Sequence, residues 1–143
     1  MTRRLQVRSS GFLFSLFLIA GCGSDSPTAP TTDFISLNSI APAAGTTLTA
    51  GDRVTFTAVV TCTIVNSTGG FTAMVLQDQG NRTLLGEGEI PPQVTLQKGT
   101  TTVTLSHTIT IPQSGSTVTV ALPIFVNEST STRAVVTRNY TVR

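Results

Sequence analysis

The side chains of this chain that could hold a metal ion are few and widely spaced. There are two cysteines, Cys22 and Cys62, and one histidine, His107, while Met74 is the only methionine after the first residue. A thiolate, an imidazole and a thioether are soft ligands of the kind that copper accepts. Blue-copper sites need a second histidine, however, and structural zinc sites need about four thiolate or imidazole ligands. We therefore predict no resident metal or cofactor.

The acidic residues Asp78, Glu87 and Glu89 lie close together near the middle of the chain. Calcium takes about six to eight oxygen ligands, and these three residues lack the spacing of a calcium loop. No serine lies in a nucleophile elbow, and no glycines form a phosphate loop. We therefore predict no enzyme. A small-ligand or metal-binding accessory domain, using His107, Met74 or the loops within residues 78–89, is the alternative to a protein-binding module.

The first residues have the pattern of an export signal. Residues 1–10 contain basic residues and no acidic one, and residues 11–20 form the apolar run GFLFSLFLIA. This run is too short to span a bilayer, which requires about 20 residues. A basic segment followed by a short apolar segment is typical of a secretory signal peptide. We therefore assign residues 1–21 to a signal peptide.

The end of this segment, residues 18–22 (LIAGC), resembles the lipobox of bacterial lipoproteins. The resemblance implies cleavage between Gly21 and Cys22 and acylation of Cys22, for example with palmitate. Two or more acyl chains anchor a protein stably, whereas one chain binds a membrane only marginally. In that family, an aspartate directly after the acylated cysteine favours retention in the inner membrane. This chain has Gly23 at that position, so the resemblance implies a location at the bacterial outer membrane or cell surface. Membrane lipid, reached through Cys22, would then be one partner.

Residues 22–33 would link the anchor to the rest of the chain. After Cys22 they read GSDSPTAPTTD, without a large apolar residue, which is typical of a flexible tether. Such a tether has a root-mean-square reach of about 18 Å. Loss of Arg3, Arg4 and Arg8 with the signal peptide lowers the Lys+Arg count from nine to six, against seven acidic residues, so the formal charge changes from +2 to −1. This balance predicts no nucleic-acid partner.

Residues 34–143 alternate apolar and polar side chains, as β-strands with one face in water do. Cys62 and His107 fall in the apolar phase of their strands, so we expect both in the core or at its rim. Turn-forming residues separate the runs. The sequence thus predicts one all-β domain of about seven or eight strands. The expected strands are residues 34–40, 46–48, 53–65, 71–77, 83–86, 101–111, 117–127 and 133–142, with a further segment at 94–97.

The start of this domain has a regular spacing of proline, glycine and apolar residues: Pro42, Gly45, Leu48, Gly51, Val54 and Phe56. This pattern resembles the start of bacterial Ig-like domains, and the resemblance implies an Ig-like antiparallel β-sandwich. That family is functionally diverse, so the resemblance implies a fold and no chemistry. Cys62 has no second cysteine in the domain, so an antibody-type disulfide is not expected.

Three expected strands, residues 71–77, 117–127 and 133–142, carry apolar residues on both faces. We expect them to be neighbours in one sheet, where an apolar outer patch would be an interaction site. The alternative is that these are the scattered exposed apolar residues that most surfaces have, or that a loop covers them. The residues that we assign to the patch are Met74, Leu76, Ala121 and Phe125.

Together these patterns predict an exported, lipid-anchored envelope protein with a non-catalytic Ig-like module for protein binding or assembly. Its protein partner would be another envelope protein or a second copy of the chain. A sugar-binding platform is disfavoured, because such platforms use exposed aromatic rings and the chain has no tryptophan and one tyrosine, Tyr140.

Overall fold

The computed structural model describes residues 32–85, 89–127 and 129–143 of the chain. The described residues form six strands and no helix, so none of them forms a helix that could cross a membrane. The signal peptide, Gly21, Cys22 and the tether as far as Thr31 lie outside the described residues. The strands are β1 (Phe34–Ala41), β2 (Arg53–Ala73), β3 (Val75–Gln77), β4 (Gln93–Thr110), β5 (Thr117–Val126) and β6 (Ser129–Thr141).

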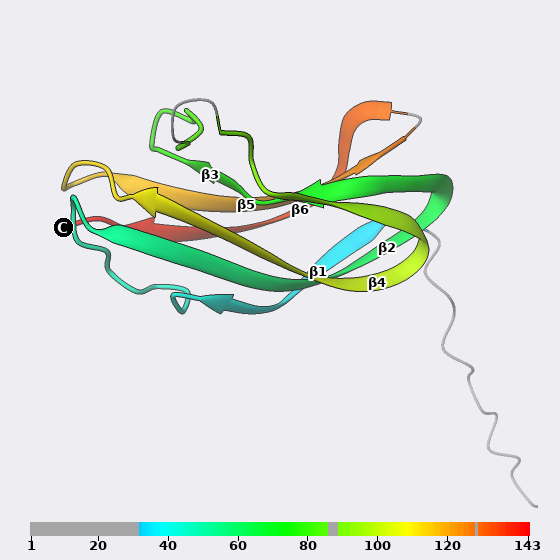
Figure 1. Cartoon of the computed structure of the whole chain (residues 1–143), viewed down its shortest axis with the longest axis horizontal. Coiled ribbons are helices and arrows are strands. Elements are labelled where there is room, and N and C mark those ends of the chain that lie inside the picture. Colours follow the sequence, from blue (N-terminus) through cyan, green and yellow to red (C-terminus); the bar gives the residue numbers. More distant parts are fainter. Residues whose placement is uncertain (1–31, 86–88, 128) are drawn as a thin grey trace, which may run out of the picture.

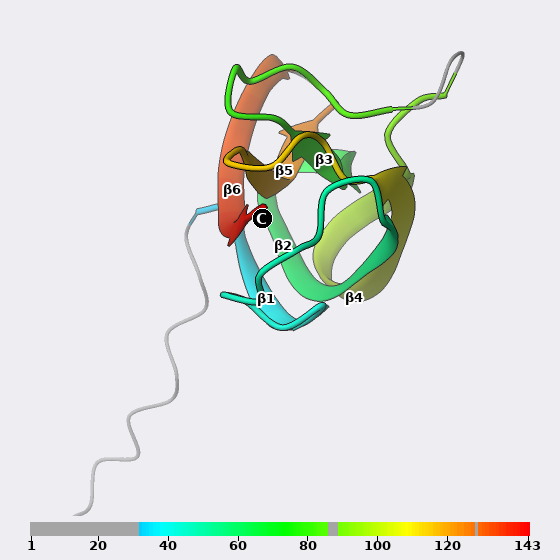
Figure 2. The same cartoon turned by 90° about the vertical axis from the view of Figure 1, so that its left-hand side faces the viewer.

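All strand pairs are antiparallel. β2 pairs with β1 on one side and with β4 on the other, and β5 pairs with β3, with β6 and with the end of β2. The strands run along the long axis of the molecule and fold into two layers (Figures 1 and 2). One layer contains β1 and the first part of β2, and the other contains β3, β5 and β6. This arrangement confirms the expected fold class, an all-β antiparallel sandwich.

β2 passes from one layer to the other. Its first part pairs with β4 up to Ile64, and the pairing resumes with a register shift at Gly69. Gly70 then lies opposite Val126 of β5, so the end of β2 pairs on both sides. A Cβ atom at Gly70 would collide with the carbonyl oxygen of Phe125. Glycine is therefore required where β2 and β5 meet, because only glycine permits so close an approach.

The core lies between the two layers and follows the alternation of the sequence. Cys62 is 1% exposed, which confirms its expected burial. The rings of Phe56 on β2 and Tyr140 on β6 meet edge to face, with their centroids 5.2 Å apart, and so join the two layers. The other buried core residues of the two central strands are Ala58, Val60 and Ile64 on β2, and Val118, Val120, Leu122, Ile124 and Val126 on β5.

The strand count differs from the expected seven or eight. In residues 46–48 only Leu48 makes a bridge, to Val142, and in residues 83–85 only Thr83 does, to Gln77. The expected strands 94–97 and 101–111 are parts of the single strand β4. The loop expected at residues 66–70 is instead part of β2. Residues 65–68 lie in the register shift between Ile64 and Gly69, and Gly69 and Gly70 pair with β4, so the strand continues despite the turn propensity of these residues.

Candidate interaction surface

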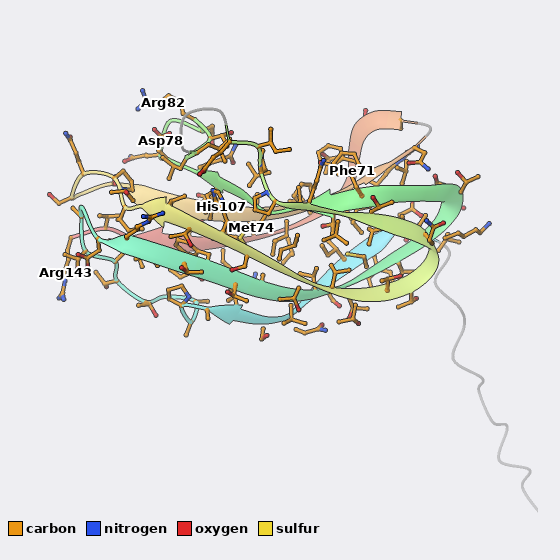
Figure 3. The ribbon with its side chains drawn as sticks, in the orientation of Figure 1. Phe71, Met74, Asp78, Arg82, His107 and Arg143 are labelled. Atoms are coloured by element: carbon orange, nitrogen blue, oxygen red, sulfur yellow. The ribbon has the colours of Figure 1, made fainter. Side chains whose placement is uncertain are left out.

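The start of the domain is held in place by a side chain of the segment before β1. Asp33 Oδ1 accepts hydrogen bonds from the backbone N–H groups of Val65, at 2.7 Å, and Asn66, at 3.2 Å. This fixes the beginning of β1 beside β2, at the end of the long axis opposite the C-terminal residue Arg143 (Figures 1 and 3). Residues that precede Asp33 therefore join the domain at one end of its long axis.

The outer face of the β3–β5–β6 layer carries a stacked aromatic pair. Phe71 lies directly opposite Phe125 in the pairing of β2 with β5. Their ring centroids are 4.8 Å apart and the ring planes differ by 20°. Phe71 is 36% exposed. In Figure 3 its side chain lies on the outer side of the layer, close to the start of β6.

Pairing extends this apolar face along the layer. Val75 lies opposite Ala121, and Val135 of β6 lies opposite Pro123 of β5. Residues directly opposite in a pair point to the same face of a sheet, so these four residues lie on the face of the phenylalanine pair. Val135 is 53% exposed. We call Phe71, Val75, Ala121, Pro123, Phe125 and Val135 the apolar outer face. Of these residues Phe71 and Val135 are exposed, Val75, Ala121 and Phe125 are half-buried, and Pro123 is buried.

The structure places Ala121 and Phe125, both half-buried, on this face, and it contradicts the assignment of Met74 and Leu76 to it. The two wrongly assigned side chains are 0% exposed and belong to the core between the layers. Opposite residues share a face, so the pairings of Phe71 with Phe125 and of Val75 with Ala121 assign residues 71 and 75 to the outside and residues 74 and 76 to the inside. Ala73, between them, is buried. The alternation of the sequence could not decide which side of this strand faces the core, because the residues on both sides are apolar.

We expected residues 71–77, 117–127 and 133–142 to be neighbours in one sheet. This is confirmed, since β5 pairs with β3, with β6 and with the end of β2. The prediction missed Phe71, Val75 and Val135 as members of the outer face. The signal that could have found Phe71 is the aromatic residue Phe125 on a strand expected beside it, because aromatic pairs are common between neighbouring strands.

The outer face of the other layer carries a row of hydroxyl groups. Threonine and serine hydroxyls of β2 and β4 face each other across the strand pair and form a ladder. The hydroxyl pairs are Thr55–Thr108 at 2.8 Å, Thr57–Ser106 at 3.1 Å, Thr61–Thr102 at 3.0 Å and Thr63–Thr100 at 2.9 Å. The same face also carries an exposed aromatic ring, because Phe34, which is 38% exposed, lies opposite Thr63.

The three soft metal ligands of the domain, Cys62, Met74 and His107, do not all lie together in the structure. Met74 and Cys62 are buried in the core, and burial raises the pKa of the Cys62 thiol. His107 lies opposite Phe56, six residues along β2 from Cys62, which is about 20 Å along a strand. Nowhere in the described ranges do three or more His, Cys, Asp or Glu residues gather as metal ligands would. These three residues therefore do not form a common metal site.

The acidic residues of the middle segment have structural roles where they are described. Asp78 Oδ1 accepts hydrogen bonds from the N–H groups of Gly80 and Arg82, and Oδ2 lies 2.8 Å from the Arg82 guanidinium nitrogen Nε. The Arg82 N–H, with these other contacts, lowers the pKa of the Asp78 carboxyl. Asp78 thus closes the turn after β3 (Figure 3). Glu87 lies outside the described residues.

A shallow groove runs beside β4. Arg53, Glu89 and Thr108 line it together with His107, whose Nε2 atom is buried and has no hydrogen-bond partner in the described part of the chain. Because Nε2 is buried, a molecule in the groove would not reach it. The groove is therefore the place where a small ligand would bind under the alternative hypothesis, but the residues that line it do not indicate a class of ligand.

Tyr140 offers no ring to a sugar. Its side chain is 1% exposed, and its hydroxyl donates a hydrogen bond to the carbonyl oxygen of Pro42 at 2.8 Å. Burial raises the pKa of this hydroxyl. Tyr140 is therefore a core residue that also fixes the segment after β1.

Comparisons with known proteins add no family to this description. No protein-family model and no curated protein matches the chain. Among solved structures the chain resembles the CARDB domain of the PF1109 protein from Pyrococcus furiosus, which was determined in complex with di-metal ions. The identity is 12% and the TM-score 0.47, over 78% of this chain and 86% of that chain. A likeness at this level carries no conclusion about what this chain binds.

Proposed function

We propose that this chain is a lipid-anchored envelope protein whose β-sandwich domain is a non-catalytic module that binds another protein. The observation that carries the binding role is the apolar outer face, with Phe71 36% and Val135 53% exposed. Exposed apolar surface in a monomer is unfavourable in water, and contiguous patches of it mark interaction sites. The hydroxyl ladder on the other layer gives the domain a second face that water solvates well.

The anchoring role is supported by the sequence of residues 18–22 (LIAGC) and by the tether that follows it. Acylation of Cys22 would hold the domain at the membrane, and a tether with a reach of about 18 Å would let the domain turn toward a partner. A binding module on such a tether meets its partners at a raised effective concentration.

The anchoring is tested with the full chain in bacterial cells grown with labelled palmitate. We expect label on the wild-type protein in the membrane fraction. Cys22→Ser should abolish the label and block cleavage of the signal segment, whereas Cys62→Ser, which also removes a thiol, should leave both unchanged. Unlabelled wild-type protein would contradict the lipoprotein assignment.

The binding role is tested by changing the apolar outer face in the same cells. Val135→Asp should reduce the amount of protein that chemical crosslinking joins to the chain, because it places a charge among apolar contacts. The matched control is Thr104→Asp, an equally exposed strand position on the hydroxyl face. Equal crosslinking of wild type and both variants would contradict a binding role for the apolar outer face.

A further inference from the structure

We infer that the partner of the apolar outer face is a short acidic segment of another protein, which presents an apolar side chain next to a carboxylate. This inference rests on the proposed function and names the chemistry of its partner. The apolar side chain would contact Phe71, Phe125 and Val135, and the carboxylate would pair with Arg133. We call these four residues of the chain the aromatic–arginine site.

A β-bulge presents Arg133 at the edge of the apolar outer face. The register of β6 against β5 shifts between Ile124 and Phe125, and Arg133 is the extra residue at this shift. Ala134 lies opposite the buried Ile124 and therefore points to the core, so its neighbours Arg133 and Val135 point outward. Bulges commonly redirect a side chain at a functional position. Here the bulge brings a cation beside Phe125 and its stacked partner.

The guanidinium of Arg133 has no partner among the residues that the structure describes. Arg133 is exposed, and no ion pair or side-chain hydrogen bond joins it to another described residue. In contrast, Arg82 pairs with Asp78, and Arg138 donates a hydrogen bond to the carbonyl oxygen of Thr137. A guanidinium offers parallel N–H donors that match the two oxygens of a carboxylate. Arg133 is therefore free to bind a carboxylate of another molecule.

The charge of the face favours an acidic partner over a second copy of the chain. Among the described residues that the pairings of β2, β3, β5 and β6 place on this face, Arg133 is the one charged residue. Two identical faces would each bring a cation and no described acid, so neither could neutralise the other. A partner whose charge is opposite complements the face and disfavours like-charged competitors.

The dimensions of the aromatic–arginine site fit a short segment. Neighbouring strands lie about 4.8 Å apart, so Phe71 on β2, Phe125 on β5 and Arg133 on β6 span about 10 Å across the layer. Val135 lies about 7 Å from Arg133 along β6. Side chains two residues apart in an extended segment have this same separation of about 7 Å, so an apolar residue and an Asp or Glu two positions away would reach Val135 and Arg133 together. Aromatic and arginine side chains are enriched among the residues that contribute most to binding at protein interfaces.

The test uses the full-length chain in cells, with a photo-crosslinking amino acid in place of Val135. Irradiation should join the chain to a protein, and mass spectrometry should identify the joined segment and the acidic residue beside it. Arg133→Glu should lower the crosslinking yield about tenfold or more, because two carboxylates then repel each other. The matched control is Arg53→Glu, which changes the net charge equally at an exposed position of β2 in the other layer and should leave the yield unchanged.

A charge exchange tests whether Arg133 pairs directly with that acidic residue. In cells with Arg133→Glu, replacement of the acidic residue of the captured protein by lysine should restore the yield. Arg133→Gln, which removes the charge without adding repulsion, should give an intermediate yield. The amount of each variant in the membrane fraction is measured alongside, so that loss of crosslinking is separated from loss of folded protein.

The outcomes separate this inference from the proposed function. A yield that Arg133→Glu leaves unchanged, a charge exchange without restoration, or a crosslinked pair of two differently tagged copies would overturn the acidic partner and leave the binding role of the face standing. No crosslinked product at Val135, or a product with lipid or polysaccharide alone, would overturn both proposals.

Discussion

At the scale of single residues, Thr72 has the most demanding environment. It is a fully buried polar residue, and its hydroxyl donates a hydrogen bond of 2.9 Å to the carbonyl oxygen of Pro123. A buried carbonyl without a donor is costly, so this hydroxyl stabilises the place where β2 meets β5.

Thr72→Val should lower the free energy of unfolding by about 1–3 kcal/mol, because valine keeps the shape but leaves the Pro123 carbonyl without its donor. Urea unfolding followed by circular dichroism measures the change. Thr104→Val, at an exposed position of β4, is the control and should change stability by no more than about 0.5 kcal/mol. Equal effects of the two substitutions would contradict a special role for Thr72.

At the scale of elements, β2 is the strand that joins the two layers, and it can do so because of its glycines. At Gly69 and Gly70 the backbones of neighbouring strands leave no room for a side chain, and the nearest carbonyl oxygens belong to Leu96 and Phe125. The crossing also brings Phe71 beside Phe125. The apolar outer face therefore depends on this short segment of β2.

Gly70→Ala should destabilise the domain by at least about 1–3 kcal/mol, because a methyl group there has no space between β2 and β5. The control is Gly80→Ala in the exposed turn after β3, where the nearest atom is a side-chain oxygen of Asp78 at 3.2 Å and no backbone atom lies within 4 Å among the three nearest atoms. We expect an effect of about 0.5 kcal/mol or less for the control. Thermal unfolding of both variants would show a large difference, and a stable Gly70→Ala protein would refute the close approach.

The strands differ in how well the sequence predicts which of their residues face the core. Where one face is polar, as in residues 53–65 and 101–111, alternation correctly assigned Cys62 to the core. In residues 71–77 both faces are apolar, so the phase was inverted and Met74 was assigned to the surface. The turn-forming residues 66–70 were also misleading, because Gly69 and Gly70 pair with β4, and Gly70 also with β5, so the segment continues the strand.

At the scale of the whole molecule, two ionisable side chains lie in the core that joins the layers. Burial raises the pKa values of both the Cys62 thiol and the Tyr140 hydroxyl. Both groups are neutral when protonated, so the folded protein holds these protons more tightly than the unfolded chain does. Stability from these groups is therefore complete below the unfolded pKa of a thiol, about 8.5, and falls as the pH rises above it.

We expect the free energy of unfolding to decline between about pH 8 and 9.5, the range in which an unfolded cysteine ionises before tyrosine does. Cys62→Ala should flatten this decline, whatever its effect at neutral pH, because alanine has no proton to lose. Urea titrations across the range measure the slope. A slope that is the same in both proteins would contradict the burial of an un-ionised thiol.

By itself the sequence determined the class of the domain, the burial of Cys62 and the separation of a signal-like segment from a β-rich region. These properties depend on local composition and on the two-residue period of a strand. Only the tertiary structure decided which apolar side chains face water, because that depends on strand register between segments distant in sequence. It moved Met74 and Leu76 into the core and placed Phe71 beside Phe125 on the outside.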